Sequence, residues 1–333
     1  MEKENDKSLM KQVQVLLRKR GEKAFKIAKR AVLEEKIKNK LVHDALQYFI
    51  EESWYDVQHP ALLSLACEAI GGDPDATTDI GAALVLLAGA ADIHDDIIDK
   101  SKVKGSKPTV FGKFGEEIAI LAGDALLFKG LILLYNACNK LTKEQSRLVL
   151  SLVKQAFFEI GNAEAKEMEL KKEKYNLTPE EYRKVIETKA AVAEMSARIG
   201  AILGGGNPKE IDALGHYGKT LGILMTIRDD FIDLFEPDEL GNRVKNECLP
   251  LPILYAFRNT RKKSEIIRLL RKDKMGEQEI EEILDLIMDM KEVQELKKEM
   301  QLLIEKEENL LNYHIKRNGN LFKLLLRSTL EDL

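Results

Sequence analysis

Two short aspartate clusters carry the side chains of this sequence that could do chemistry. The first is the run Asp95-Asp96-Ile97-Ile98-Asp99, and the second is Asp229-Asp230-Phe231-Ile232-Asp233. If the first segment is helical, Asp92, Asp95, Asp96 and Asp99 follow the spacing i, i+3, i+4, i+7, which puts four carboxylates on one face. Each cluster also ends an apolar run, IGAALVLLAGAADI at 80–93 and LGILMTI at 221–227.

Carboxylates in this setting need a compensating charge. Several acids within one turn of an apolar helix cannot all stay ionised alone, and the C-terminal end of a helix already disfavours negative charge. Divalent cations supply the compensation, and an all-oxygen ligand set suits Mg²⁺, which also bridges to substrate phosphate oxygens. The alternative without metal binding is that both aspartate clusters are solvent-exposed helix ends with no catalytic role. The predicted catalytic and metal-binding residues are Asp95, Asp96, Asp99, Asp229, Asp230 and Asp233.

Other kinds of catalysis find little support. The sequence has no GxSxG motif, and Cys67 and Cys138 lie in apolar stretches that predict core packing. His94 beside the first cluster could be a ligand or a base, but its position favours packing or support of a neighbouring ligand. The Gly-rich run at 204–206 ends a predicted helix and matches no phosphate-binding loop.

Long helices must position the two clusters. Eight prolines in 333 residues and the near absence of alternating apolar residues predict an all-α fold without a sheet. None of the breaks is long enough for an interdomain linker, so we expect a single domain over residues 1–333. The expected helices cover 8–50 (as two helices), 60–70, 78–99, 114–138, 143–172, 178–204, 208–235, 249–271, 276–289 and 292–327.

Composition excludes some partners and compartments. The net charge of −4, from 52 basic and 56 acidic residues, does not favour nucleic acid. Three scattered cysteines indicate a reducing cytoplasm rather than a disulfide framework. The first residues are too charged for a secretory signal, and the longest weakly polar run, 80–93, is too short to span a membrane. We therefore expect a cytoplasmic protein with no membrane span.

Several segments resemble the trans-isoprenyl diphosphate synthase family, also called the polyprenyl synthetase family of class I isoprenoid synthases. They are the two DDxxD clusters, KPTVFGKFG at 107–115, ILAGDALL at 120–127, ETKAAVAEMSARIGAILGG at 187–205 and GHYGKTLGILMTIRDD at 215–230. The resemblance implies an antiparallel helical bundle around a deep apolar cavity, usually as a homodimer. It also implies an allylic prenyl diphosphate substrate held through Mg²⁺, with three ions shared between the clusters and the diphosphate.

The resemblance also implies further site residues, and it fails at one half of the site. Matching positions for the allylic diphosphate are Lys104, Lys189, Arg228, Arg243 and Lys245, and the cavity positions are Ala88, Ala90, Ala91, Met225 and Thr226. The family's anchors for isopentenyl diphosphate correspond instead to Asp56, His59, Ala88 and Gly105, which leave a diphosphate short of cations. Small residues at 90 and 91 predict an open pocket for a long prenyl chain unless Phe157 or Phe158 fills it.

These departures favour a terpene-synthase-like enzyme that ionises one allylic diphosphate and then directs cyclisation or elimination. Two alternatives remain. One is a chain-elongating trans-prenyltransferase, such as a farnesyl, geranylgeranyl or polyprenyl diphosphate synthase, with an isopentenyl pocket rebuilt around Lys107, His59 or Arg243. The other is a non-catalytic subunit of such an enzyme.

Overall fold

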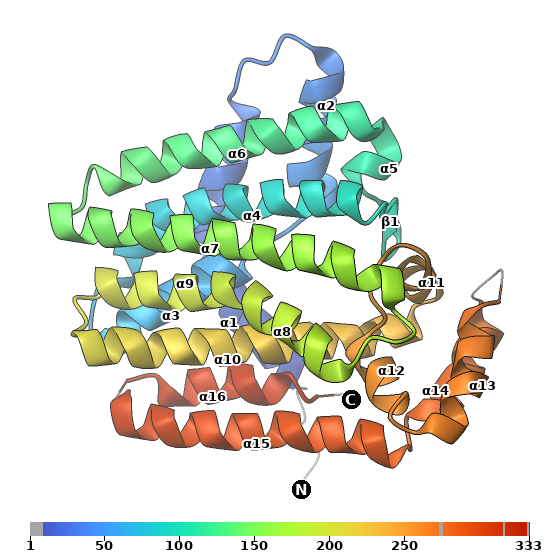
Figure 1. Ribbon diagram of the computed structural model, residues 1–333. Coiled ribbons are helices and arrows are strands. Elements are labelled where there is room, and N and C mark those ends of the chain that lie inside the picture. The colour runs from blue at the N-terminus through green and yellow to red at the C-terminus, as the bar shows by residue number, and fades with distance from the viewer. Residues whose placement is uncertain (1–8, 273–275, 316, 332) are drawn as a thin grey trace, which may run out of the picture.

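Long helices, most of them antiparallel to a neighbour, make up most of the described chain (Figure 1). The computed structural model describes residues 9–272, 276–315, 317–331 and 333. Its α-helices are α1 (Leu9–Leu33), α2 (Lys40–Tyr48), α3 (Gln58–Ile70), α4 (Thr78–Ile98), α5 (Val110–Phe114), α6 (Glu116–Cys138), α7 (Lys143–Leu170), α8 (Pro179–Lys189), α9 (Ala191–Leu203), α10 (Pro208–Ile232), α11 (Pro237–Asn246), α12 (Leu251–Ala256), α13 (Thr260–Leu270), α14 (Glu277–Ile287), α15 (Lys291–His314) and α16 (Gly319–Ser328). Short helical segments are η1 (Phe49–Ser53), η2 (Pro74–Thr77), η3 (Lys171–Glu173) and η4 (Asp233–Phe235).

The expected all-α class is confirmed, with one small correction. A two-stranded antiparallel hairpin joins β1 (Val103–Lys104) to β2 (Lys107–Pro108), with Val103 opposite Pro108. Gly105, with φ of 58°, lies in the tight turn between them. This hairpin follows the first aspartate cluster directly, so it shapes one side of the site.

Local sequence explains where several long helices begin. The side chains of Thr142, Thr178 and Asn207 each accept a hydrogen bond from a backbone N–H of the first turn. The acid or amide side chain three residues on accepts one from the backbone N–H of the cap residue. Such capping boxes contribute about 1 kcal/mol each. They begin α7, α8 and α10, the helices that bring Glu164, Lys189 and the second aspartate cluster into place.

The segment between the second cluster and α12 differs from the expectation. The expected helices end at 235 and resume at 249, but α11 lies between them and begins with Pro237 in its first turn. Proline interrupts the interior of a helix but fits its first turn. A proline in the sequence can therefore mark either the end of one helix or the start of the next. The structure also divides the expected helices 178–204, 249–271 and 292–327 into two each, at Ala190, at residues 257–259 and between α15 and α16.

Helix α4, which carries the first cluster, packs against α6, α1 and α3. A Cβ at Gly123 of α6 would lie 2.5 Å from His94 Nε2, so α6 approaches α4 closely only because residue 123 has no side chain. At the end of α4, the carboxylates of Asp95 and Asp99 lie close to that of Glu164 on α7. The aspartate-bearing ends of α4 and α10 and the last turns of α7 therefore lie at the same end of the bundle, next to α11.

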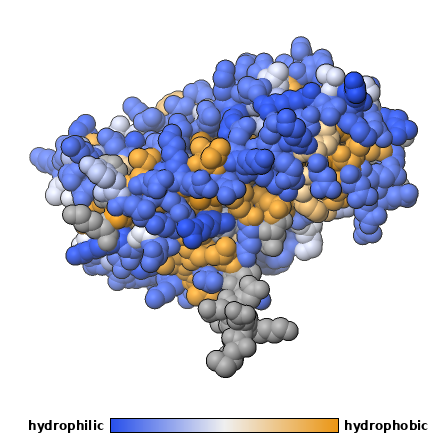
Figure 2. Space-filling model, turned by 90° about the horizontal axis from the view of Figure 1, so that it is seen from below, coloured by the Kyte–Doolittle hydropathy of each residue, from blue (hydrophilic) through white to orange (hydrophobic). Residues whose placement is uncertain are grey.

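Two helical stretches, Pro74–Ile98 and Glu116–Cys138, are long and apolar enough to cross a membrane by length and composition. The expectation that every apolar run is too short is therefore wrong, because isolated charges such as Asp124 and Lys129 hid the length of the second stretch. Of the first window 61% is buried inside the structure, which makes α4 a core helix, but only 33% of the α6 window is buried. The opposite side of the molecule, around α15 and α16, is mainly hydrophilic with separate hydrophobic areas (Figure 2).

Candidate metal and diphosphate site

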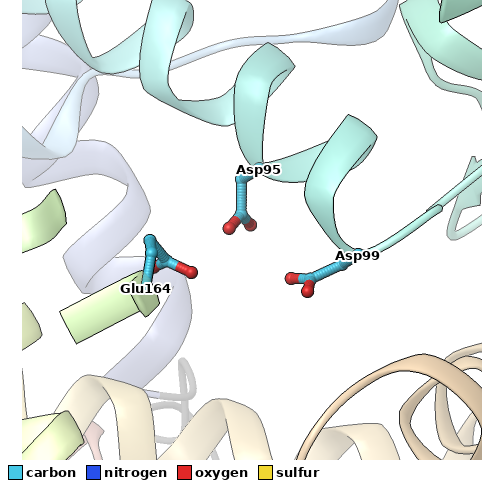
Figure 3. Close-up of side chains that lie close together, drawn as sticks. All are labelled: Asp95, Asp99 and Glu164. Atoms are coloured by element: carbon cyan, nitrogen blue, oxygen red, sulfur yellow. The ribbon is translucent and has the colours of Figure 1, made fainter. Parts of the chain in front are cut away.

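Three carboxylates from two helices converge at the end of α4. Asp95 and Asp99 lie one turn apart there, and Glu164 reaches toward them from α7 (Figure 3). One ligand oxygen from each side chain lies within 4.8 Å of the others. Because Asp95 and Asp99 lie at the end of α4 and Glu164 lies on α7, the spacing of these two helices sets the distance between the carboxylates.

The three carboxylates fit a hard divalent cation such as Mg²⁺. Asp95 Oδ1 is buried and has no hydrogen-bond partner among the described residues, although a buried carboxylate oxygen normally has one. Burial, with repulsion from Asp95 next, raises the pKa of Asp99 to about 8. Burial also raises the pKa of Glu164 to about 7 against the opposing charge of Lys189. An all-oxygen set short of positive charge is the environment that Mg²⁺ prefers.

Asp96 does not belong to this group of three carboxylates and is paired with a lysine of the chain. Its side chain is 3% exposed and lies 2.8 Å from Lys104 Nζ, which also lies 2.8 Å from Asp92 Oδ1. Burial raises the pKa of Asp96 to about 7 even though Lys104 opposes the shift. The structure thus separates Asp96 from the predicted ligands Asp95 and Asp99 and pairs it with a predicted diphosphate-binding lysine.

Lys189, the last residue of α8, lies beside the carboxylate cluster. Its Nζ is 2.9 Å from Glu164 Oε1 and 2.7 Å from Glu167 Oε2. Burial disfavours its charge, but these two acids outweigh burial and hold the pKa of Lys189 well above its usual range. A positive charge therefore lies next to the first aspartate cluster.

The second aspartate cluster has a different arrangement. Asp230 is completely buried, accepts a hydrogen bond from the backbone N–H of Leu251 at 2.9 Å, and lies 2.9 Å from Arg243 Nη2. Asp233 Oδ2 is 2.6 Å from the same nitrogen. Arg243 also donates to the Tyr182 hydroxyl at 3.0 Å. This arginine is therefore a structural partner of the second cluster.

The remaining predicted residues of this half lie around that core. Asp229 is exposed, Lys245 is exposed on the last turn of α11, and Arg228 is half-buried. Arg228 Nε is buried without a hydrogen-bond partner among the described residues, which leaves one donor in this region for a ligand. Met225 packs against the core, and the Thr226 hydroxyl donates to the Gly222 carbonyl.

Helix α11 connects the two aspartate-bearing helix ends. Asn242 Nδ2 donates to Ser101 Oγ at 3.0 Å, close behind the first cluster, and to Glu247 Oε1 at 2.5 Å. Glu247 in turn lies 3.4 Å from Arg243, the partner of the second cluster. Hydrogen bonds and an ion pair through α11 thus connect the segment after α4 with the partner of the second cluster.

The residues that were expected to repel a second diphosphate are engaged with one another. Asp56 accepts hydrogen bonds from the backbone N–H of Gln58 and from His59 Nδ1, both at 2.8 Å. Burial opposes the ionisation of Asp56, but His59 outweighs it, so the pKa of Asp56 is lowered and that of His59 is raised. Lys107 Nζ donates to the Glu52 carbonyl oxygen. Asp56 therefore carries a compensated charge, and its repulsion of a nearby anion is much weaker than the sequence implied.

The predicted cavity residues take different positions on α4. Ala88 is half-buried and Ala91 exposed, on the side of the helix that carries Asp95. Ala90 is 1% exposed and belongs to the core between α4 and α6. The side chains of Phe157 and Phe158 are 60% and 64% exposed, so in this structure they leave the interior unfilled.

Sequence reasoning missed the acids and the phenol that complete the site, which are Glu164, Glu167, Tyr182 and Glu247. Glu164 and Glu167 carry a weak signal, since they lie three residues apart around the last turns of a helix, with Ala163 buried beside them. Such spacing is common on solvated helix faces. Only the position of α7 opposite α4 distinguishes Glu164 from the other acids of this helix.

Fold and site together define an all-helical protein with an acidic cation site on facing helices. The chain belongs to the polyprenyl synthetase family, because the family described as Polyprenyl synthetase matches residues 39–287, well over half of the chain.

Relatives and solved structures are similar to different extents. The short chain isoprenyl diphosphate synthase of Methanothermobacter thermautotrophicus is 36% identical over 56% of this chain and 57% of its own length. The geranylgeranyl diphosphate synthase of Methanosarcina mazei is 33% identical over 57% of this chain and 58% of its own. The matched part thus spans less than two thirds of these relatives. A geranylgeranyl pyrophosphate synthetase structure from Pyrococcus horikoshii has a TM-score of 0.84 at 24% identity, with 97% of this chain and 99% of that chain covered, and shares the fold.

These relatives correct the functional expectation. Their names describe isoprenyl diphosphate synthases, so the expectation of terpene-synthase-like cyclisation or elimination is wrong and the chain-elongating alternative is the better supported. The physical reason lies in Asp56. We counted it as a bare negative charge in the second substrate site, whereas it is paired with His59 and bonded to two backbone N–H groups.

Proposed function

We propose that this protein is a Mg²⁺-dependent, chain-elongating trans-prenyltransferase. It joins an allylic prenyl diphosphate to isopentenyl diphosphate and releases a longer prenyl diphosphate and free diphosphate. The observation that carries the proposal is the convergence of Asp95, Asp99 and Glu164, with one buried oxygen unpartnered, in a chain of the polyprenyl synthetase family. The names of the relatives support the elongating reaction over other uses of the same site.

The residues of the site divide the work on the allylic diphosphate. Asp95 and Asp99 hold cations at the first cluster, and Asp229 and Asp233 do so at the second, with about three Mg²⁺ ions in all. When bound, Mg²⁺ neutralises the charge that develops on the departing diphosphate. Lys189 pairs with Glu164 and Lys104 with Asp92. Their ammonium groups would stabilise the phosphate oxygens of a bound substrate. Arg228 and Lys245 add positive charge at the second cluster.

The small side chains along α4 leave room for the prenyl chain. Ala88 and Ala91 follow the face of the helix that leads from Asp95 toward the interior. An apolar wall there shields the allylic cation from water once the diphosphate leaves. Since Phe157 and Phe158 point outward, they do not limit the length of the chain.

The outer face of α6 supports a homodimer. It exposes a row of large apolar side chains: Ile120, Leu121, Phe128, Leu131, Ile132 and Tyr135. Monomeric proteins rarely leave a contiguous apolar surface of this kind uncovered. A second copy packed along α6 covers it, and Phe128→Glu should then halve the mass measured by light scattering. Three free, buried cysteines support a cytoplasmic location for the single catalytic domain.

Product analysis tests the proposed reaction. The protein is incubated with Mg²⁺ and a single allylic diphosphate, with or without labelled isopentenyl diphosphate, and products are identified by mass. We expect longer labelled prenyl diphosphates only when both substrates are present. A protein that consumes neither substrate alone but raises the turnover of an active synthase added to it would instead be a non-catalytic subunit.

A further inference from the structure

Glu164 comes from α7, outside both aspartate clusters, yet its carboxylate occupies the same space as those of Asp95 and Asp99 (Figure 3). We propose that Glu164 is a third protein ligand of the first cation site, and that Lys189 competes with the cation for it. The inference rests on the proposed function only in the choice of Mg²⁺ as the resident ion.

The distances between the carboxylates favour a shared ion. An octahedral Mg²⁺ ion has bonds of about 2.1 Å, so its ligand oxygens lie about 3.0–4.2 Å apart. The ligand oxygens of Asp95, Asp99 and Glu164 already lie within 4.8 Å of one another, and a small rotation of one side chain closes the remainder. Asp95 and Asp99 approach from α4 alone. Glu164 supplies a ligand from a second helix, α7.

A second observation points to the same ion. Asp95 Oδ1 has almost no contact with solvent and receives no hydrogen bond from the described residues. Leaving a carboxylate oxygen in this state costs about 1–3 kcal/mol or more, so it is retained only where a ligand satisfies it. A cation bound among the three carboxylates would satisfy this oxygen together with oxygens of Asp99 and Glu164.

Lys189 explains how Glu164 can change partners. The ammonium lies 2.9 Å from Glu164 and 2.7 Å from Glu167, whose side chain is only 7% exposed. When Glu164 turns to the cation, Lys189 keeps its bond to Glu167 and is not left as an unpaired buried charge. The Lys189 N–H donor that had bonded Glu164 is then free to bond an anion held by the cation. Cation binding and exposure of Lys189 are thereby coupled.

Direct cation binding tests the role of Glu164. Mn²⁺ alone is titrated into the full chain without any prenyl substrate, and free Mn²⁺ is measured by electron paramagnetic resonance. We expect Glu164→Gln to weaken Mn²⁺ binding roughly tenfold or more, as loss of a metal-site side chain usually does. Glu169→Gln is the matched control, because that carboxylate lies on the same helix, 66% exposed, and pairs with Lys166. The control should bind Mn²⁺ as the unchanged protein does.

The lysine provides the second arm. Lys189→Met removes the competing charge, so Mn²⁺ should bind about threefold more tightly or better. In the Glu164→Gln background the same substitution should bring a clearly smaller gain, because the competition has been removed. Unchanged Mn²⁺ binding by a folded Glu164→Gln variant, or an equal effect of Lys189→Met in both backgrounds, would show that Glu164 is only a counter-ion. Should Glu164→Gln fail to fold, Glu164→Asp, which retracts the carboxylate by one methylene, must weaken Mn²⁺ binding.

The titration contains no prenyl substrate, so its outcome is independent of the proposed reaction. If Glu164→Gln loses Mn²⁺ binding and the unchanged protein fails to elongate prenyl chains, Glu164 remains a ligand and the proposed function is refuted. If Glu164→Gln binds Mn²⁺ normally and the unchanged protein elongates prenyl chains, the function is retained and Glu164 is not a ligand.

Discussion

The two aspartate clusters have nearly the same sequence pattern but different surroundings. At the end of α4, Asp95 and Asp99 face a third acid, and one oxygen is unpartnered. At the end of α10, Arg243 already lies against Asp230 and Asp233. The middle acid of each cluster, Asp96 or Asp230, is buried and paired with a cation from a later part of the chain. The same five-residue pattern therefore supplies both ligands and structural ion pairs, and residues distant in sequence decide which.

The sharpest test of this difference is the removal of Arg243. Arg243→Met leaves Asp230 as an unpaired charge in a fully buried position. We expect the free energy of unfolding to fall by about 3–5 kcal/mol, measured by urea denaturation. Arg147→Met is a suitable control, since its ion pair with Glu144 is exposed and should change stability little. Equal stabilities of the two variants would mean that the second cluster does not depend on its arginine.

A loss of activity with no loss of stability is expected at the first cluster. Asp95→Asn should lower kcat by about 10²–10³-fold, because a preorganised charge opposite the departing diphosphate is lost. The metal-free variant should unfold at the same urea concentration as the unchanged protein or a higher one, since mutual repulsion with Asp99 is relieved. Asp124→Asn, at an exposed position of α6, is the control. Strong destabilisation by Asp95→Asn would make its role structural.

The acids of the first region should also make stability depend on pH and Mg²⁺. The pKa values of Asp96 and Glu164 are raised to about 7 and that of Asp99 to about 8, so the folded chain binds more protons than the unfolded chain. The free energy of unfolding of the metal-free protein should then fall as the pH rises from 6 to 8, on the order of 1–3 kcal/mol. Excess Mg²⁺ should remove most of this dependence. Thermal unfolding with and without Mg²⁺ measures it, and stability that rises with pH would contradict the assignment.

The smallest effect is expected at Lys104. Its side chain is 43% exposed, and its partner Asp96 can take up a proton when the lysine is lost. Lys104→Met should cost about 1 kcal/mol of stability near pH 6. This loss is well below the loss expected for Arg243→Met. Urea denaturation of both variants at the same pH compares their free energies of unfolding. A loss as large as that of Arg243→Met would remove the distinction between the two regions.

Apolar periodicity and helix signals were sufficient to predict the all-α class and the aspartate-bearing ends of α4 and α10. They could not assign roles within the clusters, because Lys104, Arg243 and Glu164 act through space from other elements. The predicted role of Arg243 in binding diphosphate was plausible from charge alone, but its geometry is that of a buried partner. Asp56 shows the same limit, since its compensation by His59 depends on the turn that begins α3.

The burial of Asp230 bears on how variants of this protein are interpreted in a mutational scan. Asp230 accepts the Leu251 N–H and pairs with Arg243, so its substitution damages the fold before it affects any chemistry. A scan that scores growth alone would rank Asp95 and Asp230 together as intolerant. A scan that also measures cellular abundance should separate them, with Asp95 variants present at normal levels and Asp230 variants depleted by degradation. Sequence intolerance at the two aspartate motifs would then reflect two selective pressures, one on turnover and one on the lifetime of the folded chain.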